Sequence, residues 1–221
     1  MTPTLTAPGI VLRPLVLEDA PALFIALGDP NVQRYRHADT HEDVSETEDY
    51  ILNTLAMSRA AWAITEDGGE ALGRLALRVP EAGIGEFGIV LRAAAQGRGL
   101  GFKALQCAET FAFTELSLSK LTGNIDAENA ASLALFTKAG FTREALLTAN
   151  RITDLGVRDS VLMAKLAGLS QPVSLWKTPD CSSSHELVKD GSPQHLPSAR
   201  GCWPVTHSRT ACNFLPVAFG T

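Results

Sequence analysis

Apolar and polar residues alternate along this chain with a period that changes several times before residue 166. Short apolar runs have the length of strands, whereas longer stretches carry apolar residues three and four positions apart, as helices do. The order of these segments predicts β-α-α-β-β-β-α-β-α-β-β. No internal repeat of fixed period is visible, which argues against solenoids and propellers.

The segments can be placed by their apolar runs and by the Gly, Pro and Asp residues that bound them. We expect strands at residues 9–15, 61–65, 71–79, 86–91, 120–126, 143–149 and 157–166. We expect helices within residues 17–30, 42–60, 99–116 and 129–141. Turns at Asp67, Gly68 and Gly69 and at Gly83 and Gly85 join three strands that should pair antiparallel.

The helices also carry signals for their ends and their buried faces. The first should open at an acidic cap near Glu18 and Asp19, with Pro21 in its first turn, and should stop before Pro30. The second should cover a core with Tyr50, Ile51, Leu52, Leu55 and Met57. The third should lie on the sheet through Gly101, Leu105, Ala108, Ala112 and Leu116.

The composition changes after the last expected strand. Six of the twelve prolines, eight serines and three of the four cysteines lie in residues 169–221, where no apolar period is sustained. We therefore expect a domain over 9–168 and a disordered tail over 169–221, for which a shifted reading frame or vector sequence is an alternative origin. Because the tail histidines match no standard ligand spacing, we expect no metal site from His185, His195 and His207.

Charge and cysteine usage limit the classes of partner. A net charge of −5 provides no basic field, so neither nucleic acid nor a membrane surface is expected as a partner. No export signal and no apolar stretch of about 20 residues are visible, which favours a cytoplasmic protein. The cysteines form no CxxC pair, and Cys107 is interpreted as a small buried thiol on a helix.

The segment QGRGLG, residues 96–101, stands between an apolar strand and a helix. Such a junction presents unpaired N–H groups and the positive end of a helix dipole, which together favour a phosphate. Gly97, Gly99 and Gly101 would let the backbone approach an anion, while Arg98 and Gln96 could reach its oxygens. A plain glycine-rich turn is the alternative, because the segment lacks both a dinucleotide fingerprint and a nucleotide P-loop.

In this context the chain resembles the GCN5-related N-acetyltransferase family, whose Gln/Arg-x-x-Gly-x-Gly/Ala loop binds the pyrophosphate of acetyl-coenzyme A (acetyl-CoA). LTGNIDAENAASLALFTKAGF, residues 121–141, is similar to the family's fifth strand and next helix, with Asn129 and Ser132 in its Asn-x-x-Ser element. The start of the chain and IGEFGIVL, residues 84–91, resemble the subgroup of ribosomal-protein N-terminal acetyltransferases. The resemblance spans about residues 9–166 and implies a mixed, mostly antiparallel twisted sheet flanked by helices.

The resemblance also implies which residues hold the coenzyme. In the family the strand before the loop contacts the pantetheine arm through its backbone, on a splayed and bulged strand. The implied coenzyme-binding residues are Ile89, Val90, Leu91, Gln96, Gly97, Arg98, Gly99, Leu100, Gly101, Asn129 and Ser132. For Asn129 and Ser132, capping of a helix start is the alternative role.

The implied reaction is attack of a neutral amine on the thioester, and Glu86 is the candidate base, acting directly or through a water. A strand carboxylate that merely pairs with an arginine is the alternative. The family's usual tyrosine acid is replaced by Phe136, so no general acid is assigned, and a catalytically silent acyl-CoA-binding module is a second hypothesis.

The acceptor is the least defined part of the expected activity. A protein N-terminus is the first candidate, because an α-amine has a pKa near 8 and is more readily neutral than a lysine near 10.4. Small amines such as aminoglycosides or polyamines are the alternatives. A monomer or a homodimer is expected. Residues that could line the acceptor pocket are Arg34, Tyr35, Arg36, His37 and Trp62.

Overall fold

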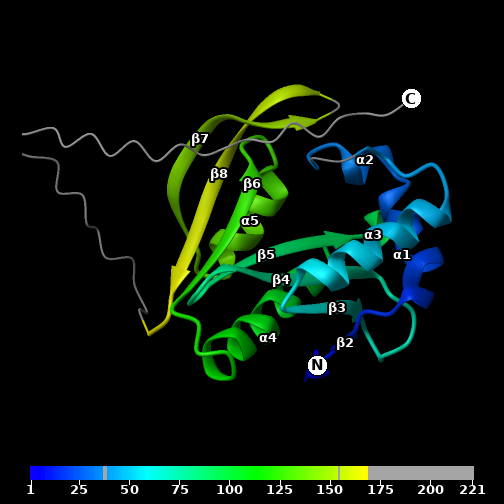
Figure 1. Cartoon of the computed structure of the whole chain (residues 1–221), viewed down its shortest axis with the longest axis horizontal. Helices are drawn as coiled ribbons and strands as arrows, with labels where there is room; N and C mark the ends of the chain where they lie inside the picture. Colours follow the sequence, from blue (N-terminus) through cyan, green and yellow to red (C-terminus); the bar gives the residue numbers. More distant parts are fainter. Residues whose placement is uncertain (37–38, 154, 169–221) are drawn as a thin grey trace, which may run out of the picture. The chain divides into compact units, whose positions relative to one another are not determined.

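The computed structural model describes residues 1–36, 39–153 and 155–168 (Figure 1). One sheet of eight strands has the order β1-β2-β3-β4-β5-β6-β8-β7 and is flanked by helices. The mixed sheet with flanking helices is as expected, but the sequence predicted seven strands. The expected tail, residues 169–221, lies outside the described residues together with its histidines and cysteines. No helix in the described ranges is both long and apolar enough to cross a bilayer.

The element bounds follow the expected order with four additions. The strands are β1 (Leu5–Ala7), β2 (Ile10–Pro14), β3 (Ala60–Thr65), β4 (Gly73–Glu81), β5 (Ile84–Leu91), β6 (Lys120–Asp126), β7 (Thr142–Thr153) and β8 (Gly156–Leu166). The helices are α1 (Ala20–Leu27), α2 (Pro30–Gln33), α3 (Val44–Met57), α4 (Leu100–Thr114) and α5 (Ala130–Lys138), with 3₁₀ turns η1 (Leu17–Asp19) and η2 (Ala93–Ala95). Sequence reasoning missed β1, α2 and both 3₁₀ turns.

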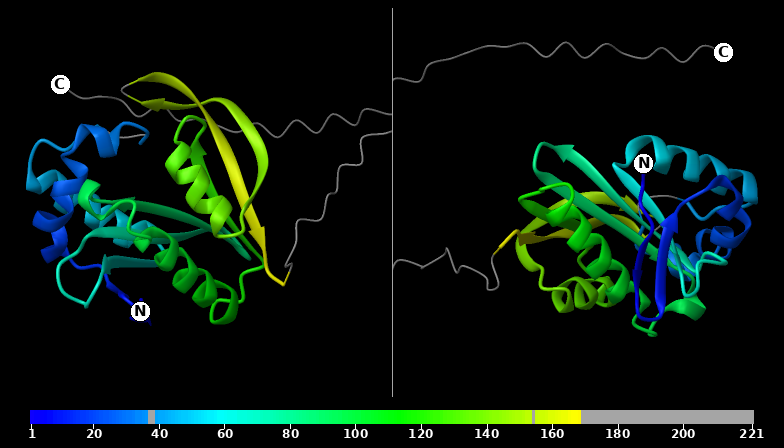
Figure 2. Two further views of the ribbon diagram at one scale, coloured as in Figure 1. Left: turned by 180° about the vertical axis from the view of Figure 1, so that it is seen from behind. Right: turned by 90° about the horizontal axis from the view of Figure 1, so that it is seen from below.

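Helices cover both faces of the sheet, which divides the core in two. One cluster joins Trp62, Leu75 and Leu105, so α4 packs on the side chains that alternate to one face. The other joins Leu23, Ile51 and Ala76, which places α1 and α3 on the opposite face. Figure 2 shows the sheet between α4 and the group of α1 and α3. The predicted α4 face is confirmed for Gly101, Leu105, Ala108 and Ala112, whereas Leu116 lies beyond the end of α4 and is half-buried.

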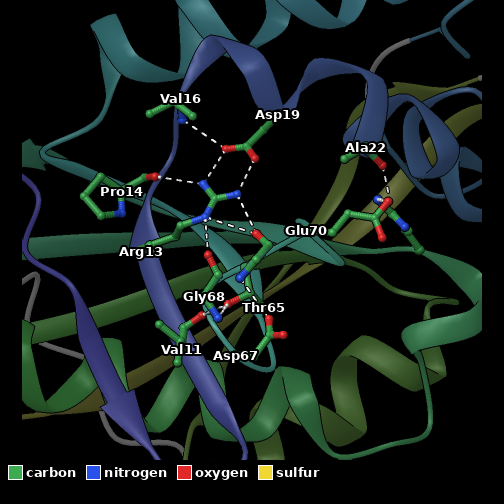
Figure 3. A network of polar contacts seen from close by, with 12 residues as sticks. Val11, Arg13, Pro14, Val16, Asp19, Ala22, Thr65, Asp67, Gly68 and Glu70 are labelled. Atoms are coloured by element: carbon green, nitrogen blue, oxygen red, sulfur yellow. Dashed lines mark hydrogen bonds and ion pairs between the residues drawn. The ribbon is translucent and has the colours of Figure 1, made fainter.

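The start of α1 differs from the expected acidic cap. Asp19 occupies the N-cap position but makes no capping bond to the helix. Instead its carboxylate accepts a two-pronged pair of bonds from Arg13, 2.8 and 2.5 Å long, and a third from the Val16 N–H (Figure 3). The charge-assisted bonds to Arg13 outcompete the cap, because a buried carboxylate needs a cation. Arg13 also donates to Gly68 and Gly69 carbonyls and so fixes the turn after β3.

The expected buried face of α3 is partly wrong. Ile51 is fully buried and Tyr50 half-buried, as predicted, but Leu52, Leu55 and Met57 are exposed. Thr47 and Thr54 take the inward positions instead, because they stand four and three residues from Ile51 on the same helix face. The predicted Gly83–Gly85 turn is also shorter than expected: Gly85 lies inside β5.

The strands β5 and β6 form the only parallel pair among the described strands, and they separate soon after they meet. Pairing covers Ile84 to Glu86 against Lys120 to Thr122, and then β6 continues along β8 while β5 continues along β4. Figure 1 shows the two strands diverging. The splay expected at Ile89–Leu91 is therefore present. The expected bulge is not, since β4 and β5 keep regular register from Glu86 to Leu91.

Candidate active site

The glycine segment 96–101 leads from η2 into α4, at the diverging end of β5. Gly97 and Gly99 have φ values of +72° and +79°, a region that other residues rarely adopt. A Cβ at either position would meet no atom within 4 Å, so space lies open in front of this backbone. Two glycines at positive φ with open space beside them leave room for a ligand to approach the main chain.

The first turn of α4 begins beside this open space. Gly99 is the N-cap and has no side chain, so no side chain caps the helix start. The first N–H groups of a helix have no intrahelical partner, and the helix dipole makes them attractive to an anion. Gly101 has another role, because a Cβ there would lie 3.3 Å from Leu91 and Leu135. It allows α4 to pack closely on β5 and α5.

A cavity of about 320 Å³, hereafter the loop cavity, lies against this turn. Its walls include nine of the eleven residues expected to bind the coenzyme: Ile89, Val90, Leu91, Gln96, Gly97, Gly99, Gly101, Asn129 and Ser132. The side chains of the other two point elsewhere. Leu100 is buried in the core, and the exposed Arg98 forms an ion pair of 2.5 Å with Glu66. Gln96 donates from its amide to the Leu91 carbonyl at 3.1 Å, which braces the loop.

A second cavity of about 640 Å³, hereafter the central cavity, lies beside the first. The two cavities share five wall residues, namely Tyr35, Arg36, Ile89, Asn129 and Ser132. Asn129 caps α5, since its side-chain oxygen accepts from the Ser132 N–H at 3.0 Å. The capping role considered from sequence is therefore present, and the same two residues line the seam between the cavities.

Glu86 belongs to the wall of the central cavity but not to that of the loop cavity. It is the register partner of Arg78 on β4, and the two side chains form an ion pair of 2.8 Å. Both are partly exposed, with 29% of the Glu86 side chain and 53% of the Arg78 side chain accessible. A pair this exposed contributes about 0–1 kcal/mol, so it does not hold the carboxylate away from other partners.

Phe136 lines the central cavity and is buried. Its ring packs edge to face on Phe141 at 5.0 Å, and a Cβ on Gly123 would come within 2.3 Å of it. The side chain is therefore a core residue with no proton to give. One polar group nearby is unsatisfied: Asn124 Oδ1 is buried without a hydrogen-bond partner among the described residues.

The residues considered for an acceptor pocket are divided by the structure. Tyr35 and Arg36 line both cavities. Trp62 is fully buried and donates from its indole to the Pro3 carbonyl at 2.7 Å, so it is a core residue. Arg34 lies over the Tyr35 ring and is absent from both walls, while His37 falls outside the described residues.

Several polar wall residues were not found from the sequence. In the central cavity they include Tyr50, Arg74, Arg78, Asn150 and Arg151. Arg74 and Arg78 stand four residues apart on an apolar strand, which puts both on one face. This spacing of two arginines was the sequence signal that could have identified them as wall residues. In the loop cavity, the Lys138 ammonium lies 4.8 Å from the centre of the Phe102 ring, at the C-terminal end of α5.

Burial shapes the charges of the central cavity. Burial, and after it the positive charges of Arg36 and Arg78, lowers the pKa of Arg74 to about 9, and burial lowers the pKa of Arg36 to about 10. Both stay cationic at neutral pH. Burial also lowers the pKa of Arg151, while Asp126 and Glu86 oppose that effect. Within the described ranges no group of His, Cys, Asp or Glu has the arrangement of a metal site.

Comparison with known proteins agrees with this geometry. The family model described as "Acetyltransferase (GNAT) domain" matches residues 10–142. An uncharacterized N-acetyltransferase, p20, of Bacillus licheniformis is 30% identical over 151 residues, covering 65% of this chain and 85% of its own. Spermidine N(1)-acetyltransferase of Escherichia coli K12 is 29% identical over 143 residues, covering 63% of this chain and 76% of its own.

Comparison with solved structures finds the same fold. RimJ of Mycobacterium smegmatis, solved with CoA-disulfide, superposes with a TM-score of 0.66 at 24% identity and covers 75% of this chain and 86% of its own. The family model matches most of the described domain, and β5 and β6 diverge beside the glycine loop. These two findings together assign the activity class. The chain belongs to the GNAT acetyltransferase family and is an acetyl-CoA-dependent N-acetyltransferase.

Proposed function

We propose that acetyl-CoA binds along the loop cavity and that a primary amine enters the central cavity, so that the two meet at Ile89, Asn129 and Ser132. The observation that carries this proposal is the shared wall of the two cavities. The loop cavity contains the main-chain donors, whereas the central cavity contains Glu86. An acyl donor and an amine need this arrangement, because the reaction requires their reactive atoms to be about 3 Å apart.

The residues present fit the coenzyme. Gly97 and Gly99 leave the first-turn N–H groups of α4 open to a diphosphate, and Lys138 supplies a cation on the same cavity wall. The unpaired edge of β5, from Phe87 to Leu91, faces the gap where β6 has diverged, and it offers backbone groups to an amide-containing arm. When bound, acetyl-CoA supplies the acetyl group as an activated thioester.

Glu86 is proposed to take the proton of the amine, directly or through a water. Its place on the wall of the central cavity supports this, as does the weakness of its exposed pair with Arg78. Asn124 Oδ1 is proposed to accept a second N–H of the amine, because it is a buried acceptor that has no partner among the described residues. No side chain is proposed as the general acid, since Phe136 is a hydrocarbon in the core.

For the acceptor, the first candidate is an α-amine, such as that of a protein N-terminus, with small amines as the alternative. An α-amine is partly neutral near pH 8, so one carboxylate is sufficient to activate it. Of the two relatives named above, one is a spermidine N(1)-acetyltransferase and the other is uncharacterized, so they do not identify the acceptor of this chain. The α-amine proposal therefore rests on this chain's own cavity.

A thiol-release assay tests the proposal. Purified protein with acetyl-CoA should release thiol when given N-terminal peptides or α-amino compounds, and mass spectrometry should find the acetyl group on the α-nitrogen. Release with peptides blocked at the N-terminus but carrying free lysine side chains would overturn the α-amine assignment. Binding of acetyl-CoA without release for any amine would overturn the proposed acceptor site.

A further inference from the structure

The central cavity has an excess of positive charge in a protein that is negative overall. Four arginines line it, Arg36, Arg74, Arg78 and Arg151, against the two carboxylates of Glu86 and Asp126, whereas the whole chain carries a net charge of −5. Both carboxylates are already paired: Glu86 with Arg78 at 2.8 Å and Asp126 with Arg158 at 3.0 Å. The excess is therefore concentrated at the other arginines.

Two of these arginines contact one aromatic ring. Tyr50 on α3 has the Arg36 guanidinium 4.9 Å from its ring centre and the Arg74 guanidinium 5.0 Å away. Arg74 Nε donates to the Tyr50 hydroxyl at 2.7 Å, and Arg74 Nη1 donates to the Gly88 carbonyl at 3.1 Å. Arg36 donates to the Gln33 side chain at 2.7 Å. These neutral contacts fix the guanidinium groups without neutralising them.

Arg36 and Arg74 differ from Arg78 in their acidic neighbours. Among the residues that the structure describes, neither Arg36 nor Arg74 has an acidic side chain within 4.0 Å. Half-buried cations are costly to hold near one another, and burial together with the charges of Arg36 and Arg78 lowers the pKa of Arg74 to about 9. Two close, unpaired arginines are typical of a binding site, because a bound anionic ligand offsets their positive charge.

We propose that Arg36 and Arg74 bind an anionic group of the acceptor, so that the preferred substrate is a primary amine that also carries a carboxylate or phosphate. This inference rests on the proposed function. Tyr50 acts as a positioning residue for the pair. By the same charge balance, the cavity disfavours polyamines, whose two or more ammonium groups would face arginines.

The spacing on β5 limits the size of this acceptor. Arg74 reaches the carbonyl of Gly88, which is two residues along the strand from Glu86, or about 7 Å. An amine near Glu86 and an anion near Arg74 are then separated by only a few bonds. An α-amino acid, a short aminoalkyl phosphate and a peptide whose second residue is acidic all meet this condition.

Matched substrates test the charge requirement and separate these sources. The pairs are alanine against alaninamide, O-phosphoethanolamine against ethanolamine, and peptide Ser-Asp-Ala against Ser-Asn-Ala, with spermidine alone. The charged member of at least one pair should have a kcat/KM about tenfold or more above its neutral partner. Equal values in all three pairs, or spermidine as the best substrate, would overturn the inference while leaving the proposed function intact. No thiol release with any amine would instead overturn the proposed function.

Variants assign the preference to the two arginines. Arg74→Gln and Arg36→Gln should each raise KM for the charged acceptor about tenfold, with a smaller change for the neutral one. Arg59→Gln is the matched control, because it removes the same charge from an exposed position that lines neither cavity. Arg74→Lys should restore part of the affinity, since it keeps the charge but not the planar fork.

A binding measurement gives a readout that does not depend on turnover. Calorimetry without acetyl-CoA should show that the favoured charged acceptor binds wild type and Arg59→Gln, and binds Arg36→Gln about tenfold more weakly. Acetyl-CoA should bind all of these proteins equally. If Arg36→Gln and Arg74→Gln instead lose acetyl-CoA affinity, the arginines serve the coenzyme phosphates and the inference is wrong. If Arg74→Gln does not fold, Arg36→Gln alone decides.

Discussion

Arg78 and Glu86 are register partners on β4 and β5, and their side chains form an ion pair of 2.8 Å in the wall of the central cavity. Of the two roles that the sequence left open for Glu86, the contact shows the pairing with an arginine, and the role as a base stays a proposal. Glu86 also stands beside the space proposed for the amine. The two roles predict different turnover for a variant in which both Glu86 and Arg78 are replaced.

Glu86→Gln should lower kcat about a hundredfold, with acetyl-CoA affinity unchanged, because general base catalysis contributes about 10²–10⁴-fold. Steady-state kinetics and calorimetry measure the two quantities. Glu81→Gln, which removes the same charge from the exposed end of β4, should have no effect on either. The double variant Glu86→Gln/Arg78→Gln should keep the lowered kcat of Glu86→Gln. Recovery of turnover in the double variant would show that Glu86 only balances Arg78.

Gly123→Ala should destabilise the fold by about 1–3 kcal/mol, because the added Cβ would lie 2.3 Å from the buried Phe136 ring. The free energy of unfolding in urea measures this effect. Adding Phe136→Leu, which frees space at the ring edge, should recover part of the loss. Equal unfolding free energies for wild type and Gly123→Ala would contradict the tight contact between β6 and α5.

Asp126 should make stability depend on pH in the acid range. Burial by itself would raise its pKa, but hydrogen bonds from Arg158 and Glu128 N–H and the charges of Arg158 and Arg151 lower the pKa below its ordinary value of 3.8. The carboxylate therefore stabilises the fold fully above pH 3.8, and this contribution is lost as the pH falls through the lowered pKa. Asp126→Asn should be less stable than wild type at pH 7, and the difference should shrink at pH 3. A constant difference in urea denaturation would contradict this account.

Local pattern was sufficient for most of the fold. Polar and apolar residues alternate over 120–126, which follows a turn and ends at Asp126. The strand β6 has these same bounds. β1 was missed because its three residues, Leu5–Ala7, lie in a short segment between Pro3 and Pro8 and have no period of their own. Its stability comes from pairing with β2, a tertiary contact that a short window cannot contain. The helix α2 is likewise a four-residue turn capped by Asp29.

The loop half of the candidate site was visible in the sequence, whereas only Tyr35, Arg36 and Glu86 of the acceptor half were named from it. Gln96 to Gly101 are contiguous, so their backbone role can be inferred from one segment. Arg36 lies in the loop after α2, Tyr50 on α3 and Arg74 on β4, and only the tertiary fold brings these three residues together. The exposed Leu52 and Leu55 show the same limit, because the helix period does not say which face meets the sheet.

The binding of the coenzyme diphosphate by the α4 turn is the central claim, and Gly99→Ala tests it. At φ +79° a Cβ is strained and would project into the open space in front of the loop, without a clash in the free protein. Gly156→Ala is a matched control, because Gly156 has φ +91° with nothing within 4 Å and lines neither cavity. Pantetheine, which lacks the diphosphate, serves as the reference ligand.

The deciding measurement is calorimetric titration of coenzyme A and of pantetheine into wild type, Gly99→Ala and Gly156→Ala. Wild type and Gly156→Ala should bind coenzyme A about a hundredfold or more tightly than pantetheine, and in Gly99→Ala this ratio should fall at least about tenfold. A ratio that is the same in all three proteins would contradict diphosphate binding at this turn.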